Sequence, residues 1–104
     1  MTTAIAKFRA FAALLQIDQG KAEFDSLRAF FEEDAWNHLT NEAEECGLEP
    51  RKVIEGFVFL EAAPYLMNAA ETAEERDEMA AGIADRIAEF TAMHLMQVRK
   101  ALAA

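Results

Sequence analysis

The two histidines are the residues of this chain best suited to acid–base or metal chemistry. His38 falls at helical spacing with Asp34, Glu42 and Glu45, and carboxylates around an imidazole can hold a divalent cation. The exposed side of an acidic helix has the same pattern, and the paired Glu-x-x-His motif of helical di-iron sites is missing. We therefore expect no metal site and no other cofactor.

The second histidine, His94, belongs to a predicted last helix. Its neighbours on one apolar stripe should be Ile83, Ile87, Phe90, Val98 and Ala101. A histidine on such a stripe is usually a core or interface residue, and the sequence places no acid or nucleophile beside it for catalysis. Met96 should instead lie among charged side chains: Asp85, Glu89, Arg99 and Lys100. A methionine in that setting indicates a contact surface, so His94 and Met96 are candidate interface residues.

The remaining candidates for covalent chemistry are few. Cys46 is the single cysteine, which excludes an intramolecular disulfide and a Cys-rich metal site, and favours a reducing, cytoplasmic location. It shares a predicted inner stripe with Trp36 and Leu39, so we expect it to be buried and unreactive. The sequence holds no Gly-rich phosphate loop, nucleophile elbow or zinc-helix motif. We therefore expect a protein that is not an enzyme, with no catalytic residues.

A short segment offers a different function. The segment has a small residue at Ala43, a glycine four positions later at Gly47, and apolar residues at Leu48 and Val53. In this spacing, residues 43–57 resemble the turn of a helix-turn-helix DNA-binding domain. The resemblance covers about 20 of the 104 residues and would imply a DNA-binding regulator.

The segment also departs from that family. Glu42 stands where an apolar residue is wanted, and Gly56 stands where a second core contact is expected. The would-be recognition helix offers Arg51 and Lys52, followed by mostly apolar residues that cannot read bases. The other interpretation is an ordinary helical hairpin with a glycine cap.

The net charge of −9 is concentrated in two stretches. Residues 31–49 hold seven acidic residues and no Lys or Arg, and residues 71–89 hold seven acidic residues against two arginines. Such faces can simply keep a protein soluble, or they can meet a basic partner, whereas direct binding of DNA or RNA would be repulsive. We take six glutamates as the candidate partner-binding face: Glu42, Glu44, Glu45, Glu74, Glu75 and Glu78.

The elements that position these residues are all predicted to be helices. A first helix should place Ile5, Phe8, Ala12 and Leu15 inward. A second should place Phe24, Leu27, Phe30 and Phe31 inward, and Asp34 would cap a third over residues 35–46. Residues 21–46 could equally form one bent helix, and the sequence leaves this open.

The second half of the chain has clearer boundary signals. Gly47 and Leu48 form a C-terminal cap, and Pro50 begins a fourth helix that is apolar on nearly every side and so central, with Pro64 ending or kinking it. A capping box at Thr72 begins a last helix of about 45 Å, which must bend at Gly82, fray or project toward a partner. The expected core includes seven of these residues: Trp36, Leu39, Phe57, Leu60, Ile83, Ile87 and Phe90.

These patterns predict an all-α fold, a compact bundle of four to five helices with a long C-terminal helix, in a single domain over residues 1–104. No apolar run approaches the roughly 20 residues that span a bilayer. We expect a protein that binds another protein with a basic surface, as an inhibitor, adaptor or regulatory subunit. Its size and acidity are similar to those of small inhibitors made by phages and other mobile elements, including those that block host defence complexes. The alternatives are the helix-turn-helix regulator and a small-ligand or metal-binding protein.

A homodimer or larger assembly is a further expectation. The fourth helix is apolar around its circumference, and the apolar sector of the last helix spans more than half of its wheel. One small domain has difficulty covering both helices from its own side chains.

Overall fold

The computed structural model describes the backbone of residues 4–103 and the side chains from Arg9 to Ala103. Over these residues the chain forms six α-helices, one 3-10 helix and no strand, which confirms the all-α prediction. The helices are α1 (Ala4–Asp18), α2 (Phe24–Leu27), η1 (Arg28–Phe30, 3-10), α3 (Glu33–Glu45), α4 (Pro50–Asn68), α5 (Ala73–Arg86) and α6 (Ala88–Ala103).

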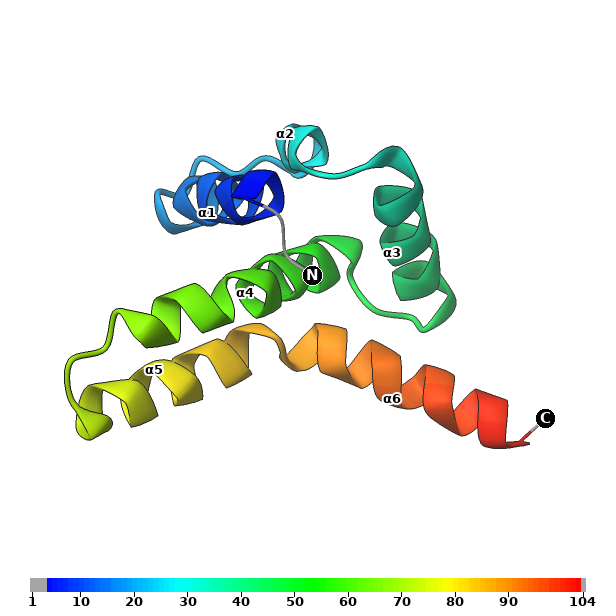
Figure 1. Ribbon diagram of the computed structural model, residues 1–104. Helices are drawn as coiled ribbons and strands as arrows, with labels where there is room; N and C mark the ends of the chain where they lie inside the picture. Colours follow the sequence, from blue (N-terminus) through cyan, green and yellow to red (C-terminus); the bar gives the residue numbers. More distant parts are fainter. Residues whose placement is uncertain (1–3, 104) are drawn as a thin grey trace.

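Helix α4 lies at the centre of the bundle, as its apolar pattern predicted. Helix α1 covers one side of α4, α5 and α6 cover the other, and α3 stands across the end of α4 (Figure 1). Each of these four helices contacts α4 directly. The buried residues of α4 point in all these directions: Val53, Ile54, Gly56, Val58, Phe59 and Ala62.

The turn between α3 and α4 is set by local signals. Gly47 has a φ of 70°, a left-handed conformation that glycine adopts without strain. Its N–H donates to the carbonyl of Glu44 at 3.1 Å, and the N–H of Leu48 donates to the carbonyl of Ala43 at 2.8 Å. This is the Schellman cap, and Pro50 then occupies the first turn of α4, where its missing N–H costs nothing. Both predictions are confirmed.

The open question about residues 21–46 is resolved in favour of separate helices. Phe31 is extended, with φ −120° and ψ 152°, and ends the α2–η1 segment. Its ring packs 5.4 Å from Trp36 and 5.6 Å from Phe57. Asp34 is not the N-cap that we predicted, because α3 already begins at Glu33 and Glu32 takes that position without a side-chain bond.

The inward side of α1 also differs from the prediction. Leu15 is 55% exposed, whereas Ala13 and Leu14 are buried. The helix therefore turns the stripe of Ala10, Ala13 and Ile17 toward the core rather than that of Ala12 and Leu15. The side chains of Ile5 and Phe8 lie outside the described residues.

The predicted core is partly confirmed. Trp36, Leu39 and Phe90 are buried, and three other members are half-buried: Phe57, Ile83 and Ile87. Leu60 was placed wrongly, since it is 41% exposed. Pro64 neither ends nor interrupts α4, and it lies on the same exposed side as Leu60. Pro64 has no N–H to donate to the carbonyl of Leu60. Because this side of α4 is exposed, the carbonyl can bond to water instead.

The last helix begins as predicted and breaks elsewhere. Thr72 Oγ1 accepts a hydrogen bond from the Glu75 N–H at 3.1 Å, and the Glu75 carboxylate accepts one from the Glu71 N–H at 3.0 Å. Of the alternatives that we considered for this long helix, a bend does occur, but at Ile87, where φ is −94° and ψ 3°, and not at Gly82. Gly82 stays inside α5.

The break coincides with a close approach between helices. A Cβ on Gly56 of α4 would lie 2.9 Å from the Cβ of Phe90 and 3.3 Å from the Cα of Ile87. The α5–α6 junction thus rests on the one residue of α4 that has no side chain, and the bend is fixed by packing rather than by helix propensity.

This approach predicts opposite effects for two glycine-to-alanine substitutions. Gly56→Ala should destabilise the fold by about 1–3 kcal/mol, because the new methyl group overpacks the junction. Gly82→Ala is the matched control: nothing lies within 4 Å of its Cβ position, so alanine should stabilise α5 by about 0.5–1 kcal/mol. Chemical unfolding of both variants measures the difference. A neutral Gly56→Ala would contradict the close packing of the junction on α4.

Candidate partner-binding surfaces

The acidic residues of α3 form the first candidate surface. Glu44 and Glu45 are exposed, whereas Glu42 is half-buried and accepts a hydrogen bond from Gln97 Nε2 of α6 at 2.8 Å. Glu42 therefore links the two helices and is less available to a partner. Among the described residues the single ion pair joins Arg51 and Glu55 at 3.1 Å, so the charges of α3 are not neutralised by contact.

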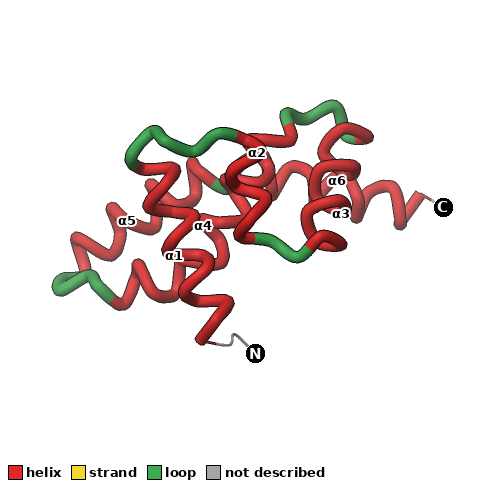
Figure 2. The backbone as a smooth tube through the Cα atoms, turned by 90° about the horizontal axis from the view of Figure 1, so that it is seen from above, coloured by secondary structure: helices red, strands yellow, loops and turns green. Residues whose placement is uncertain are grey.

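The acidic residues of α5 form a separate surface. Glu74 and Glu78 are exposed, while the carboxylate of Glu75 is engaged in the cap of α5. Helices α5 and α3 lie toward opposite ends of the molecule (Figures 1 and 2). The six predicted glutamates are therefore not one face, and one partner of ordinary size would meet only half of them.

Met96 joins the first of these surfaces. A shallow hollow of about 260 Å³ lies between α3 and α6, and Met96 lines it together with Glu42, Glu45, Cys46, Gln97 and Lys100. The structure thus brings a predicted interface methionine beside two predicted glutamates. Cys46, which we expected to be buried, is half-buried at this hollow.

His94 lies on the surface of α6. Its ring meets the ring of Phe90 edge-on, with 4.6 Å between centroids, but the residue is exposed. Val98 and Ala101, which we placed on the same apolar stripe, are exposed as well. Of the two alternatives for His94 the core position is excluded and the interface position stays a prediction, because the core side of α6 is formed by Phe90 and Met93, and the later turns extend beyond α4 (Figure 1).

The residues of an exposed apolar stripe on α6 were not singled out from the sequence, although we expected the apolar sector of the last helix to be wider than one domain can cover. Leu95, Val98 and Leu102 are 49%, 53% and 81% exposed and follow one another at spacings of three and four residues. Within α6 the same spacing continues toward the N-terminus through Thr91 and Ala88, which are also exposed. This is the pattern by which helices pack along a seam. It was visible in the sequence, but only packing could show that it faces solvent.

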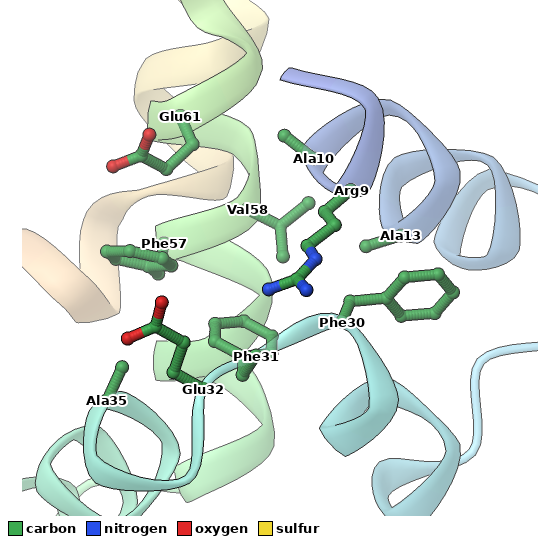
Figure 3. A pocket seen from close by; sticks show the side chains of 10 residues that line it. All are labelled: Arg9, Ala10, Ala13, Phe30, Phe31, Glu32, Ala35, Phe57, Val58 and Glu61. Atoms are coloured by element: carbon green, nitrogen blue, oxygen red, sulfur yellow. The ribbon is translucent and has the colours of Figure 1, made fainter. Parts of the chain in front are cut away.

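A second unpredicted feature is a cavity of about 500 Å³ (Figure 3). Four segments surround it: α1, the end of η1 with the residues that follow, the start of α3, and the middle of α4. Among the residues whose side chains the structure describes, its lining is mostly apolar and includes three charged residues: Arg9, Glu32 and Glu61.

The segment that resembles a helix-turn-helix forms two helices joined by a glycine turn, but α4 is not presented as a recognition helix. Four other helices cover it, and its middle residues are buried. Arg51 is engaged within the fold: its Nη2 donates to the carbonyl of Ala22 at 2.6 Å and its Nε to Glu55 at 3.1 Å. Of the two predicted cations Lys52 alone is exposed, so this geometry does not favour DNA binding through α4.

The polar stripe around His38 does not gather into a metal site. No group of three or more His, Cys, Asp or Glu side chains that could hold a metal ion occurs among the described residues. The side chains of Asp34, His38 and Glu45 are instead spread along the exposed side of α3.

The part of the chain that the structure describes has no helix with both the length and the apolar character needed to cross a membrane. Comparisons with protein-family models, with curated proteins and with solved structures gave no match to this chain.

Proposed function

We propose that this chain is a non-catalytic protein that binds another protein through the outer side of α6 and the adjoining end of α3. The exposed stripe of Leu95, Val98 and Leu102 is the observation that carries the proposal. Protein interfaces commonly have an apolar centre with a polar or charged rim, and Glu44 and Glu45 would supply such a rim. An inhibitor, an adaptor or a small regulatory subunit would each use a surface of this kind.

The amount of exposed surface supports the proposal. The chain exposes 7004 Å², whereas a compact monomer of its mass would expose about 5,800 Å². Its radius of gyration is 14.4 Å, against about 13 Å for a compact domain of this length. Binding would cover part of this excess, especially along α5 and the end of α6, where few side chains are buried.

The charge of α3 favours a partner with a basic surface. Exposed carboxylates without ion pairs create a negative field that attracts and orients such a partner before contact. A basic nucleic-acid-binding surface of another protein would fit this description, and blocking it would make the chain an inhibitor.

The test uses the partner recovered with the intact chain from its native host. Reversing Glu44 and Glu45 to Lys should slow association about tenfold, with a smaller effect on dissociation, because these charges act on the encounter. Association of the unaltered chain should also slow between 0.1 M and 1 M salt, where the screening length falls from about 10 Å to about 3 Å. Stopped-flow or surface-based kinetics provide both measurements.

A second double reversal, Glu74→Lys with Glu78→Lys, is the matched control on α5. It changes the net charge by the same amount at the other end of the molecule. If the double reversals on α3 and on α5 slow association equally, or if the association rate does not change with salt, then the charges of α3 do not guide the partner.

A homodimer is the second candidate, and the stripe of α6 supports it too. Within α6 the large side chains Leu95, Val98 and Leu102 occupy the C-terminal part of the stripe and the small ones, Ala88 and Thr91, its N-terminal part, so antiparallel pairing of α6 in two copies would place large side chains opposite small ones. In that case the excess surface of the monomer would be covered by its own copy.

A further inference from the structure

The cavity between α1 and α4 has an apolar floor and aromatic walls. Ala13 of α1 and Val58 of α4 are buried beneath it. Phe30, Phe31 and Phe57 line it and are each half-buried, so they leave apolar surface open to the cavity (Figure 3). An apolar group of suitable size would gain free energy by covering these rings.

Two of the aromatic side chains that line the cavity pack against buried aromatic rings of the core. The ring of Phe31 packs on Trp36 at 5.4 Å and on Phe57 at 5.6 Å, and Phe57 packs on Phe90 at 5.7 Å. Trp36 and Phe90 are themselves buried. The cavity therefore exists before any ligand enters, which reduces the entropy lost on binding.

The charges around the cavity are predominantly negative. Glu32 and Glu61 stand on one side of it and Arg9 reaches in from the other (Figure 3). All three residues are exposed, and none of their side chains has a hydrogen bond or ion pair within the described part of the chain. Glu33 and Asp34 follow Glu32 directly, so the cavity lies at the acidic N-terminal end of α3, the opposite end of the helix from Glu44 and Glu45.

We propose that this cavity receives an arginine side chain, together with an adjoining apolar residue, from the basic partner. The inference rests on the proposed function and assigns it a specific anchor. Arginine fits the cavity because its planar guanidinium stacks on aromatic rings and donates paired hydrogen bonds to carboxylates. A volume of about 500 Å³ is within the range of small-ligand sites and accommodates more than one side chain.

The position of Arg9 supports this choice of ligand. Arg9 lines the cavity together with the aromatic rings, so the cavity accommodates a guanidinium, and the exposure of Arg9 means that its side chain can move aside when another cation enters. Arg9 then acts as an internal competitor, while Glu32 and Glu61 favour the incoming charge.

Three capped dipeptides test the cavity without the partner. Acetyl-Leu-Arg-amide should shift the methyl NMR signals of Ala10, Ala13 and Val58, which line the cavity. Acetyl-Leu-Gln-amide should bind more weakly, and acetyl-Leu-Glu-amide should bind most weakly. Preference for the Glu dipeptide, or no methyl shift with any of the three, would overturn the proposal.

Substitutions at the rim should change the affinity in opposite directions. Glu61→Gln and Glu32→Gln should each weaken binding of the Arg dipeptide about two- to fivefold, as expected for an exposed charge pair. Arg9→Ala should tighten it by a similar factor, because it removes the competing cation. Glu78→Gln on α5 removes the same charge far from the cavity and should leave the affinity unchanged.

The sign of the Arg9→Ala effect is decisive. Weaker binding in that variant would mean that Arg9 holds the ligand and that the cavity selects an anion, which would overturn the inference. Failure here would be distinguishable from failure of the proposed function. The kinetics of the Glu44 and Glu45 reversals depend on the surface of α3, whereas the dipeptides report only on the cavity.

Discussion

Replacing Ile54 with alanine is expected to lower the free energy of unfolding by about 2–5 kcal/mol, a large part of the 5–15 kcal/mol that typically stabilises a domain. Ile54 has no exposed surface and lies on α4, which other helices hold on several sides. They cannot all move inward to fill the space that the side chain leaves, so a cavity would remain. Emission from Trp36, the single tryptophan, reports unfolding, because this residue is buried against Phe24 and Phe31.

Leu60→Ala on the same helix is the control. Leu60 is 41% exposed, and we expect its replacement to cost less than about 1 kcal/mol. Comparable losses at the two positions would contradict the orientation of α4, or would show that its exposed side is covered in solution.

Local signals explain what the sequence could predict. Gly47, Pro50 and Thr72 each act through a hydrogen bond, or through the lack of a donor, within a few residues of their own position. The C-terminal end of α3 and the first residues of α4 and α5 could therefore be predicted, and with them the all-α class and the central place of the most apolar helix.

The sides that helices expose could not be read in the same way. A helix that is apolar all round, such as α4, does not reveal which side its neighbours leave open, so Leu60 was placed in the core. On α6 the apolar stripe of Phe90, His94 and Val98 could belong to the core or to an interface, and only the structure shows that the helix continues past the end of α4 and leaves Val98 exposed. The break at Ile87 depends on Gly56, a residue about 30 positions earlier that no local pattern connects to it.

The cavity shows the same limit for the site. Arg9, Phe31 and Glu61 come from three separate elements, and only packing on α4 brings them together. Of the residues that we predicted from the sequence, Glu42, Glu45 and Met96 did converge, because the C-terminal end of α3 meets α6. Glu74, Glu75 and Glu78 lie apart from them on α5.

The double substitution Leu95→Gln with Val98→Gln should weaken partner binding about thirtyfold or more. Central apolar residues of an interface commonly contribute about 2 kcal/mol or more, and about 1.4 kcal/mol corresponds to a tenfold change. Glutamine is a good helix former and adds no charge, so the loss should appear as faster dissociation, with association unchanged. In this respect the variant differs from the reversals on α3, which should slow association. Both residues are about half exposed, so the free energy of unfolding should change by less than about 0.5 kcal/mol.

The same variant distinguishes a foreign partner from a second copy of this chain. If α6 pairs with itself, light scattering should give a mass above 11.6 kDa for the unaltered chain and a monomer for the double variant. Leu15→Gln on α1 is the control, since Leu15 is 55% exposed but lies outside the stripe, and it should alter neither mass nor binding. A monomeric unaltered chain whose partner binding survives the double substitution would exclude the stripe as the contact surface. Glu44 and Glu45 at the C-terminal end of α3 and the cavity at its N-terminal end would then remain as candidate contacts for a basic partner.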